Sequence, residues 1–196
     1  NQNGTMIRKI GDGKHDITSI YGYNEENGDV YYQAAALNPH DRQVFVSHKN
    51  GKVERLTDQE GWNSAIFSGD CQFFINTWSN YYTPYTFTLR SQKGKVLSVL
   101  LDNSKLKDKM AEYGWSKREP FTFTTSEGIS LDGWMLKPNN FDPSHKYPVI
   151  LFQYSGPGSQ QVVDSWKAGS LGNGGAFDQY LVQQGFIVVC VDGRGT

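Results

Sequence analysis

An internal repeat in the first half of the chain constrains its fold more than any other feature. The segment Lys49–Val53 (KNGKV) returns as Gln92–Val96 (QKGKV), an offset of 43 residues, and residues 44–46 return as 86–88, an offset of 42. Repeats of this length are typical of the four-stranded blades of β-propellers. We therefore predict two such blades in residues 1–101, unless two hairpin-rich stretches resemble each other by coincidence.

Each repeat unit contains four short strand-like runs separated by turn signals such as Asn50-Gly51. The predicted strands are residues 18–23, 30–35, 43–48, 53–56, 63–68, 71–77, 85–90 and 96–101. The composition agrees with short strands and many turns, because 14% of residues are aromatic, 21 are glycine and only 37% are hydrophobic. Closed propellers use about 4–8 blades, so two blades indicate part of a larger protein.

The pattern changes after Leu101, at the boundary where we expect a second domain, residues 102–196, to begin. A helix start at residues 102–105 is followed by Leu106, Met110 and Tyr113 at near-helical spacing, which predicts a linker helix. Residues 121–124 and 131–136 predict a hairpin.

Two continuous apolar runs, 149–152 and 186–191, are typical of parallel strands buried on both faces. Between them lies a predicted crossover helix that ends at Gly185, and its expected apolar stripe consists of Ala176, Phe177, Tyr180 and Leu181. These elements predict the beginning of an α/β domain, so the fold class as a whole is mixed β and α/β.

Charge and apolar runs exclude several classes of partner. The formal net charge is −1 and no segment concentrates basic residues, so we expect no nucleic acid partner. No apolar run reaches the 18 or more residues of a transmembrane helix. Cys71 and Cys190 lie in strand-like runs without a CxxC or histidine companion, which predicts buried free thiols and no metal or cofactor.

Several motifs in the second half resemble the opening of the hydrolase domain of the prolyl oligopeptidase family of serine peptidases, in its dipeptidyl peptidase IV branch. They are Gly133–Pro138 (GWMLKP), Asn140–Pro143 (NFDP), Lys146–Val149 (KYPV), Tyr154–Gln160 (YSGPGSQ) and Val191–Gly195 (VDGRG). Upstream, Val96–Met110 resembles that branch's junction between propeller and hydrolase. The resemblance covers essentially the whole chain and implies the last two propeller blades followed by the N-terminal part of an α/β-hydrolase domain.

The resemblance assigns one catalytic residue to this chain. Tyr154 matches the tyrosine of the family's Tyr-x-Gly-Pro motif, whose hydroxyl donates to the oxyanion of the tetrahedral intermediate. A buried core tyrosine is the alternative for this position. No Gly-x-Ser-x-Gly nucleophile motif is present, so the catalytic serine, aspartate and histidine are expected beyond Thr196, and this chain alone is expected to be inactive.

Other polar residues are given structural or solvent-exposed roles. Gly156, Pro157 and Gly158 are expected to shape the loop that presents Tyr154, and Arg194 is expected to anchor a neighbouring loop rather than to contact substrate. Glu25-Glu26 resembles the glutamate pair that binds a substrate amino terminus in this branch, but it precedes Asn27-Gly28 and is predicted to be a solvated turn. The four histidines lack paired ligand spacing, and none is predicted to be catalytic.

As the resemblance implies, the complete protein is expected to be a serine exopeptidase that releases N-terminal Xaa-Pro or Xaa-Ala dipeptides from peptide substrates. The alternatives are an acylaminoacyl peptidase or prolyl endopeptidase of the same superfamily, and a propeller module that binds peptides without catalysis. The family also implies a homodimer, and a location in the periplasm, cell envelope or exterior.

Overall fold

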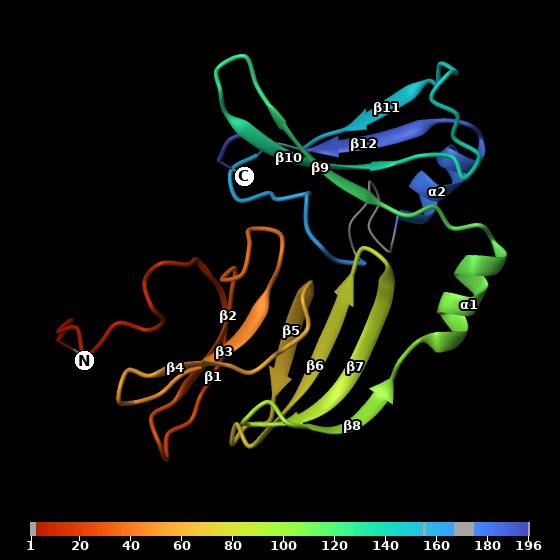
Figure 1. Ribbon diagram of the computed structural model, residues 1–196. Coiled ribbons are helices and arrows are strands. Elements are labelled where there is room, and N and C mark those ends of the chain that lie inside the picture. The colour runs from red at the N-terminus through yellow and green to blue at the C-terminus, as the bar shows by residue number, and fades with distance from the viewer. Residues whose placement is uncertain (1–2, 155, 167–174, 196) are drawn as a thin grey trace. The chain divides into compact units, whose positions relative to one another are not determined.

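The computed structural model describes residues 3–154, 156–166 and 175–195 (Figure 1). The chain divides into two compact units. Unit 1 comprises Asn1–Ser79 and Tyr85–Asp102, and unit 2 comprises Asn80–Pro84 and Asn103–Thr196. The short segment Asn80–Pro84, which includes the turn between two strands of a unit 1 sheet, therefore clusters with unit 2.

Unit 1 contains two four-stranded sheets, in each of which the strands follow one another in chain order (Figure 1). The strands of the first sheet are β1 (Ile17–Tyr23), β2 (Val30–Ala34), β3 (Gln43–Ser47) and β4 (Val53–Arg55). Those of the second are β5 (Trp62–Phe67), β6 (Phe73–Asn80), β7 (Thr83–Ser91) and β8 (Val96–Leu101). All eight predicted strands are confirmed, each within three residues at either end.

The core of unit 1 lies between its two sheets. Tyr31 and Val44 from the first sheet and Phe74 from the second are nearly inaccessible and belong to one apolar cluster. The Phe67 ring bridges them, with its centroid 4.5 Å from that of Tyr31 and 4.7 Å from that of Phe74. Each sheet therefore buries a face that it cannot bury alone.

Cys71 also belongs to this core, but the strand predicted for it is wrong. Strand β6 begins at Phe73, and Cys71 lies in the preceding turn with a φ of 57°. Its backbone N–H donates to Ser68 O at 2.9 Å, so the turn extends through Cys71 before the ladder starts. The predicted burial of both thiols is confirmed, since Cys71 and Cys190 are both buried and free.

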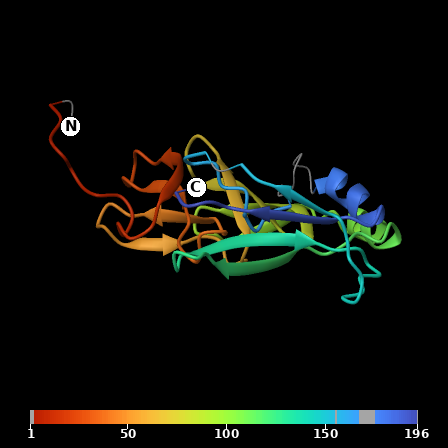
Figure 2. The same cartoon turned by 90° about the horizontal axis from the view of Figure 1, so that it is seen from above.

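Unit 2 is built on a mixed sheet with the order β11-β12-β10-β9 (Figure 1). Its strands are β9 (Glu119–Thr124), β10 (Ser130–Leu136), β11 (Val149–Phe152) and β12 (Ile187–Val191). Strands β11 and β12 are parallel, as predicted, whereas β10 runs antiparallel to both β12 and β9. Strands β10 and β12 run side by side in both views (Figures 1 and 2).

The prediction that β11 is buried on both faces is wrong for this chain. Val149 is 59% exposed and Leu151 is 61% exposed. The physical reason is that successive side chains of a strand point to opposite faces of the sheet, and the described residues cover only the face of Ile150 and Phe152, which are half-buried. Burial concentrates instead on the central strands, where Trp134, Leu136 and Val188 form the apolar core together with Tyr81.

Two helices complete unit 2, α1 (Ser104–Glu112) and α2 (Ala176–Gln183). Helix α1 has no buried residue. Gly185 lies just past the end of helix α2, as predicted, with a φ of 88° and an N–H that donates to Val182 O at 3.0 Å.

The apolar stripe predicted for α2 is largely wrong. Phe177 and Tyr180 are about half exposed, while the buried residues are Asp178, Gln179 and Val182. Polar contacts decide which face is buried, because Gln179 forms two hydrogen bonds with the backbone of Ser116.

No helix among the described residues is long and apolar enough to cross a bilayer.

Candidate active site

Tyr154 lies just beyond the carboxyl end of β11, where the chain leaves the parallel pair. Its side chain is 61% exposed, and its hydroxyl forms no hydrogen bond with any residue that the structure describes. Ligands of α/β sheets bind outside the carboxyl ends of the strands. The phenol is therefore outside the packed core and free to donate a hydrogen bond at that end of the sheet.

A tight turn follows Tyr154 directly. Ser159 N–H donates to Gly156 O at 3.0 Å, and the two central residues are Pro157 and Gly158, with Gly158 at a φ of 70°. Proline followed by a left-handed glycine is the signature of a type II turn. A Cβ at Gly156 would lie 3.3 Å from Cε1 of Tyr154, so the absence of a side chain lets the tyrosine ring lie against the backbone.

Asp192 holds the C-terminal end of this loop through hydrogen bonds. It follows β12 directly and is 8% exposed. Its carboxylate accepts the backbone N–H of Gln161 at 2.9 Å and 3.1 Å and that of Val162 at 2.8 Å, while its own N–H donates to Asp132 O at 3.1 Å. Hydrogen bonds to a charged acceptor are roughly twice as strong as neutral ones. The loop is therefore held at the end of the strand adjacent to β11.

A second carboxylate anchors the residues that follow. Asp164 Oδ1 accepts the backbone N–H of Tyr81 at 2.7 Å. The Tyr81 ring enters the core of unit 2, where it is 8% exposed and its hydroxyl has no hydrogen-bond partner among the residues that the structure describes. Burial raises the pKa of this hydroxyl far above its ordinary value near 10, and the charge of Asp164 adds to the effect.

Arg194 forms an ion pair with Glu127 in the turn between β9 and β10, at an Nη1 to Oε2 distance of 3.1 Å. The side chains of both residues are about two-thirds exposed, so the pair contributes little to stability. The predicted role of Arg194, as a loop anchor rather than a substrate contact, stays a prediction.

A deeply buried cation of unit 2 lies elsewhere and was not singled out from the sequence. Arg118 is 3% exposed, and its guanidinium lies 4.7 Å from the centroid of the Trp134 ring. Burial lowers the pKa of Arg118, and the nearby Asp178 carboxylate opposes that shift. Burial also raises the pKa of the Cys190 thiol to about 12, which keeps this core cysteine unreactive.

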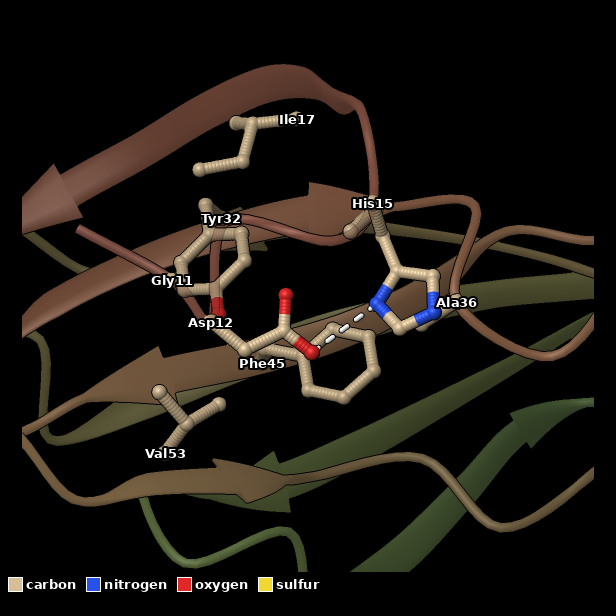
Figure 3. A pocket seen from close by; sticks show the side chains of 9 residues that line it. Gly11, Asp12, His15, Ile17, Tyr32, Ala36, Phe45 and Val53 are labelled. Carbon is tan, nitrogen blue, oxygen red and sulfur yellow. Dashed lines mark hydrogen bonds and ion pairs between the residues drawn. The ribbon is translucent and has the colours of Figure 1, made fainter.

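Three of the four histidines pair with an aspartate, and the Glu25-Glu26 pair lies in a turn. His15, His48 and His145 each lie within 2.9 Å of an aspartate carboxylate. Figure 3 shows His15 hydrogen-bonded to Asp12 at a small pocket that is also lined by Tyr32, Phe45 and Val53. Its volume is about 20 Å³, close to the minimum for a single water molecule, so it is no substrate site. The two glutamates lie exposed in the turn between β1 and β2, as predicted.

The sequence contains a signal for one of the two anchoring aspartates, Asp192, but none for the other, Asp164. Asp192 directly follows a continuous apolar strand, a position that favours functional polar residues in α/β folds, and this signal was available. The bond between Asp164 and Tyr81 joins residues 83 positions apart, and no local pattern indicates it.

Comparisons with known proteins agree on one family. Residues 1–85 match the family model described as dipeptidyl peptidase IV (DPP IV) N-terminal region. The chain is 28% identical over 187 residues to a probable dipeptidyl peptidase 4 of Aspergillus flavus, covering 94% of this chain and 24% of that protein. It is 29% identical over 203 residues to human dipeptidyl peptidase 8, covering 95% of this chain and 22% of that protein.

A solved structure matches the chain along its full length. The crystal structure of Porphyromonas gingivalis dipeptidyl peptidase 4 superimposes with a TM-score of 0.88 and 37% sequence identity, covering 100% of this chain and 27% of that one. The chain thus spans about a quarter of the length of the relatives that it matches. It belongs to the dipeptidyl peptidase IV family.

Proposed function

We propose that this chain is part of a serine exopeptidase that releases N-terminal dipeptides, with proline or alanine in the second position, from peptide substrates. The structural match to a dipeptidyl peptidase 4, which covers 100% of this chain and 27% of that one, carries the proposal. The exposed hydroxyl of Tyr154 at the end of a parallel strand supports it, because the proposed reaction needs a donor in that kind of position.

We also propose the architecture that places these parts in the larger protein. The sheets β1–β4 and β5–β8 are assigned to the last two blades of a β-propeller, an assignment supported by the 42- and 43-residue repeat and by the chain-order sheets. Residues 102–196 are assigned to the linker and to the first strands of an α/β-hydrolase domain. The parallel β11–β12 pair with a helix before β12 supports this second assignment.

In the proposed reaction, a serine outside this chain attacks the carbonyl carbon of the second substrate residue, and its hydroxyl proton passes to a general base, which then serves as the general acid. The carbonyl oxygen becomes negative in the tetrahedral intermediate, and the neutral phenol of Tyr154 donates a hydrogen bond to it. The C–N bond then breaks, the leaving amine takes a proton from the general acid, and an acyl-serine ester remains. Water hydrolyses this ester, which releases the dipeptide and restores the serine hydroxyl.

The test is hydrolysis of chromogenic amides by the full-length protein. Gly-Pro-p-nitroanilide should be cleaved, whereas the same dipeptide blocked at its amino terminus should not. Cleavage of acetyl-alanine p-nitroanilide alone would indicate an acylaminoacyl peptidase, and cleavage of the blocked Gly-Pro amide a prolyl endopeptidase. Binding of peptides without cleavage of any amide would indicate a non-catalytic module, and each of these results overturns the proposal.

Two further properties are proposed on the family resemblance alone. We propose that the full-length protein is a homodimer, which light scattering of the purified protein tests by its mass. We propose a location in the periplasm, cell envelope or exterior, which fractionation of the source cells tests. A monomer in the first experiment, or a cytoplasmic signal in the second, overturns the respective proposal.

A further inference from the structure

We infer that Asp192 is a positioning residue for Tyr154: its carboxylate fixes the loop that presents the phenol, and so it contributes to catalysis without touching the substrate. This inference rests on the proposed role of Tyr154 as an oxyanion donor. It identifies the group that gives this donor its orientation.

The connection between the two residues follows from the parallel strands. Tyr154 follows β11 and Asp192 follows β12, and because the pair is parallel, both residues leave the sheet at the same end. The loop that begins at Tyr154 returns to this end, where the N–H groups of Gln161 and Val162 meet the Asp192 carboxylate at 2.8–3.1 Å. One end of the loop is thus fixed by β11 and the other by a charge at the end of β12.

Within this loop, one described turn restricts the backbone. The turn at Gly156–Ser159 is closed by a hydrogen bond of 3.0 Å and contains proline, whose φ is fixed. The side chain of Tyr154 has no hydrogen bond with a described residue, so the position of its Cα, which the backbone sets, decides where the phenol can reach. Loss of the Asp192 anchor should therefore reach Tyr154 through the turn.

The chemistry of Asp192 suits an anchor better than a proton carrier. Both carboxylate oxygens accept backbone N–H groups, one of them from two residues, and the side chain is 8% exposed. Without this acceptor, two N–H groups in partly or fully buried positions would have to find other partners. A shift of about 1 Å in a catalytic group can cost about 100-fold in rate.

The experiment is a double-mutant cycle in the full-length protein, with kcat and KM measured on Gly-Pro-p-nitroanilide for the wild type, Tyr154→Phe, Asp192→Ala and the double variant. We expect Asp192→Ala to lower kcat about 10- to 100-fold with KM nearly unchanged. Because Asp192 acts through Tyr154, the double variant should have a kcat within about threefold of Tyr154→Phe alone. The matched control is Glu119→Gln, which removes the charge of an exposed carboxylate on β9 that pairs with Lys137. It should leave kcat unchanged.

The outcomes separate this inference from the proposed function. If Tyr154→Phe leaves kcat unchanged, the role of Tyr154 fails, and the positioning role of Asp192 fails with it. If Tyr154→Phe lowers kcat but Asp192→Ala does not, or if the two losses multiply in the double variant, only the inference is overturned. Should Asp192→Ala not fold, Asp192→Asn is read in the same way, since it keeps one acceptor oxygen and should give a smaller loss that again vanishes in the Tyr154→Phe background.

Discussion

Replacing Tyr81 by phenylalanine and by alanine separates the packing of a buried ring from the cost of its hydroxyl. The ring lies in the core of unit 2 with Trp134 and Leu136, and it is 8% exposed. The hydroxyl has no hydrogen-bond partner in the described part of the chain. We therefore expect opposite effects from the two substitutions, because one removes only an unsatisfied polar group and the other removes the ring as well.

The magnitudes follow from burial and from the pKa. An unsatisfied buried polar group costs about 1–3 kcal/mol, so Tyr81→Phe should be neutral or stabilising, whereas Tyr81→Ala should cost about 3–5 kcal/mol. Since burial holds the folded-state pKa of Tyr81 far above 10, the stability contributed by the neutral hydroxyl is present below pH 10 and is lost as pH rises above it. Between pH 10 and pH 11 the wild type should therefore lose about 1 kcal/mol more than Tyr81→Phe.

Scanning calorimetry of the 196-residue chain measures the stability effect of each substitution and the difference between wild type and Tyr81→Phe at pH 10 and pH 11. For a chain of this size, 1 kcal/mol corresponds to about 2–4 °C in Tm, so Tyr81→Ala should melt about 6–20 °C lower. Tyr81→Phe should melt at the wild-type temperature or above it, with an advantage that grows from pH 10 to pH 11. A Tyr81→Phe variant that melts several degrees lower would refute the reasoning, because it would show that the hydroxyl has a stabilising partner.

Two further substitutions test the packing of the units. Gln179→Ala removes the amide that pairs with the buried N–H and C=O of Ser116 at 2.8 Å and 2.9 Å, and it should lower the free energy of unfolding by about 2–4 kcal/mol in thermal unfolding. Gln183→Ala, at an exposed position, is the control and should lower it by less than about 1 kcal/mol. Equal losses would contradict the assignment. Gly94→Ala places a Cβ against the carbonyl of Leu56 at a φ of 81°, and should cost about 2–4 kcal/mol in urea titrations, whereas a neutral result would contradict this close approach.

The sequence predicted the strands well because their patterns are local. The alternation within each repeat unit and the Asn-Gly turn between β3 and β4 are read from neighbouring residues, and every predicted strand end lies within three residues of the observed one in unit 1. The parallel β11–β12 pair was also predicted, since continuous apolar runs on either side of a helix have few other arrangements.

Tertiary contacts account for what the sequence did not predict. The buried face of α2 carries Asp178 and Gln179 rather than Phe177 and Tyr180, because its partners are a buried arginine and a backbone segment far away in the chain. Burial of β11 on both faces fails because nothing among the described residues covers the face that carries Val149 and Leu151. The prediction for Tyr154 came from a motif, and its exposure at the strand end was established only by the fold.

The most direct test of the central claim is kcat for Tyr154→Phe in the full-length protein, measured with Gly-Pro-p-nitroanilide. Removal of one oxyanion donor costs about 100- to 1000-fold in kcat. We predict a loss of this size with KM changed by less than about threefold, because the hydroxyl acts on the charge that forms in the transition state. A kcat equal to that of the wild type would contradict the assignment of Tyr154 to the oxyanion hole.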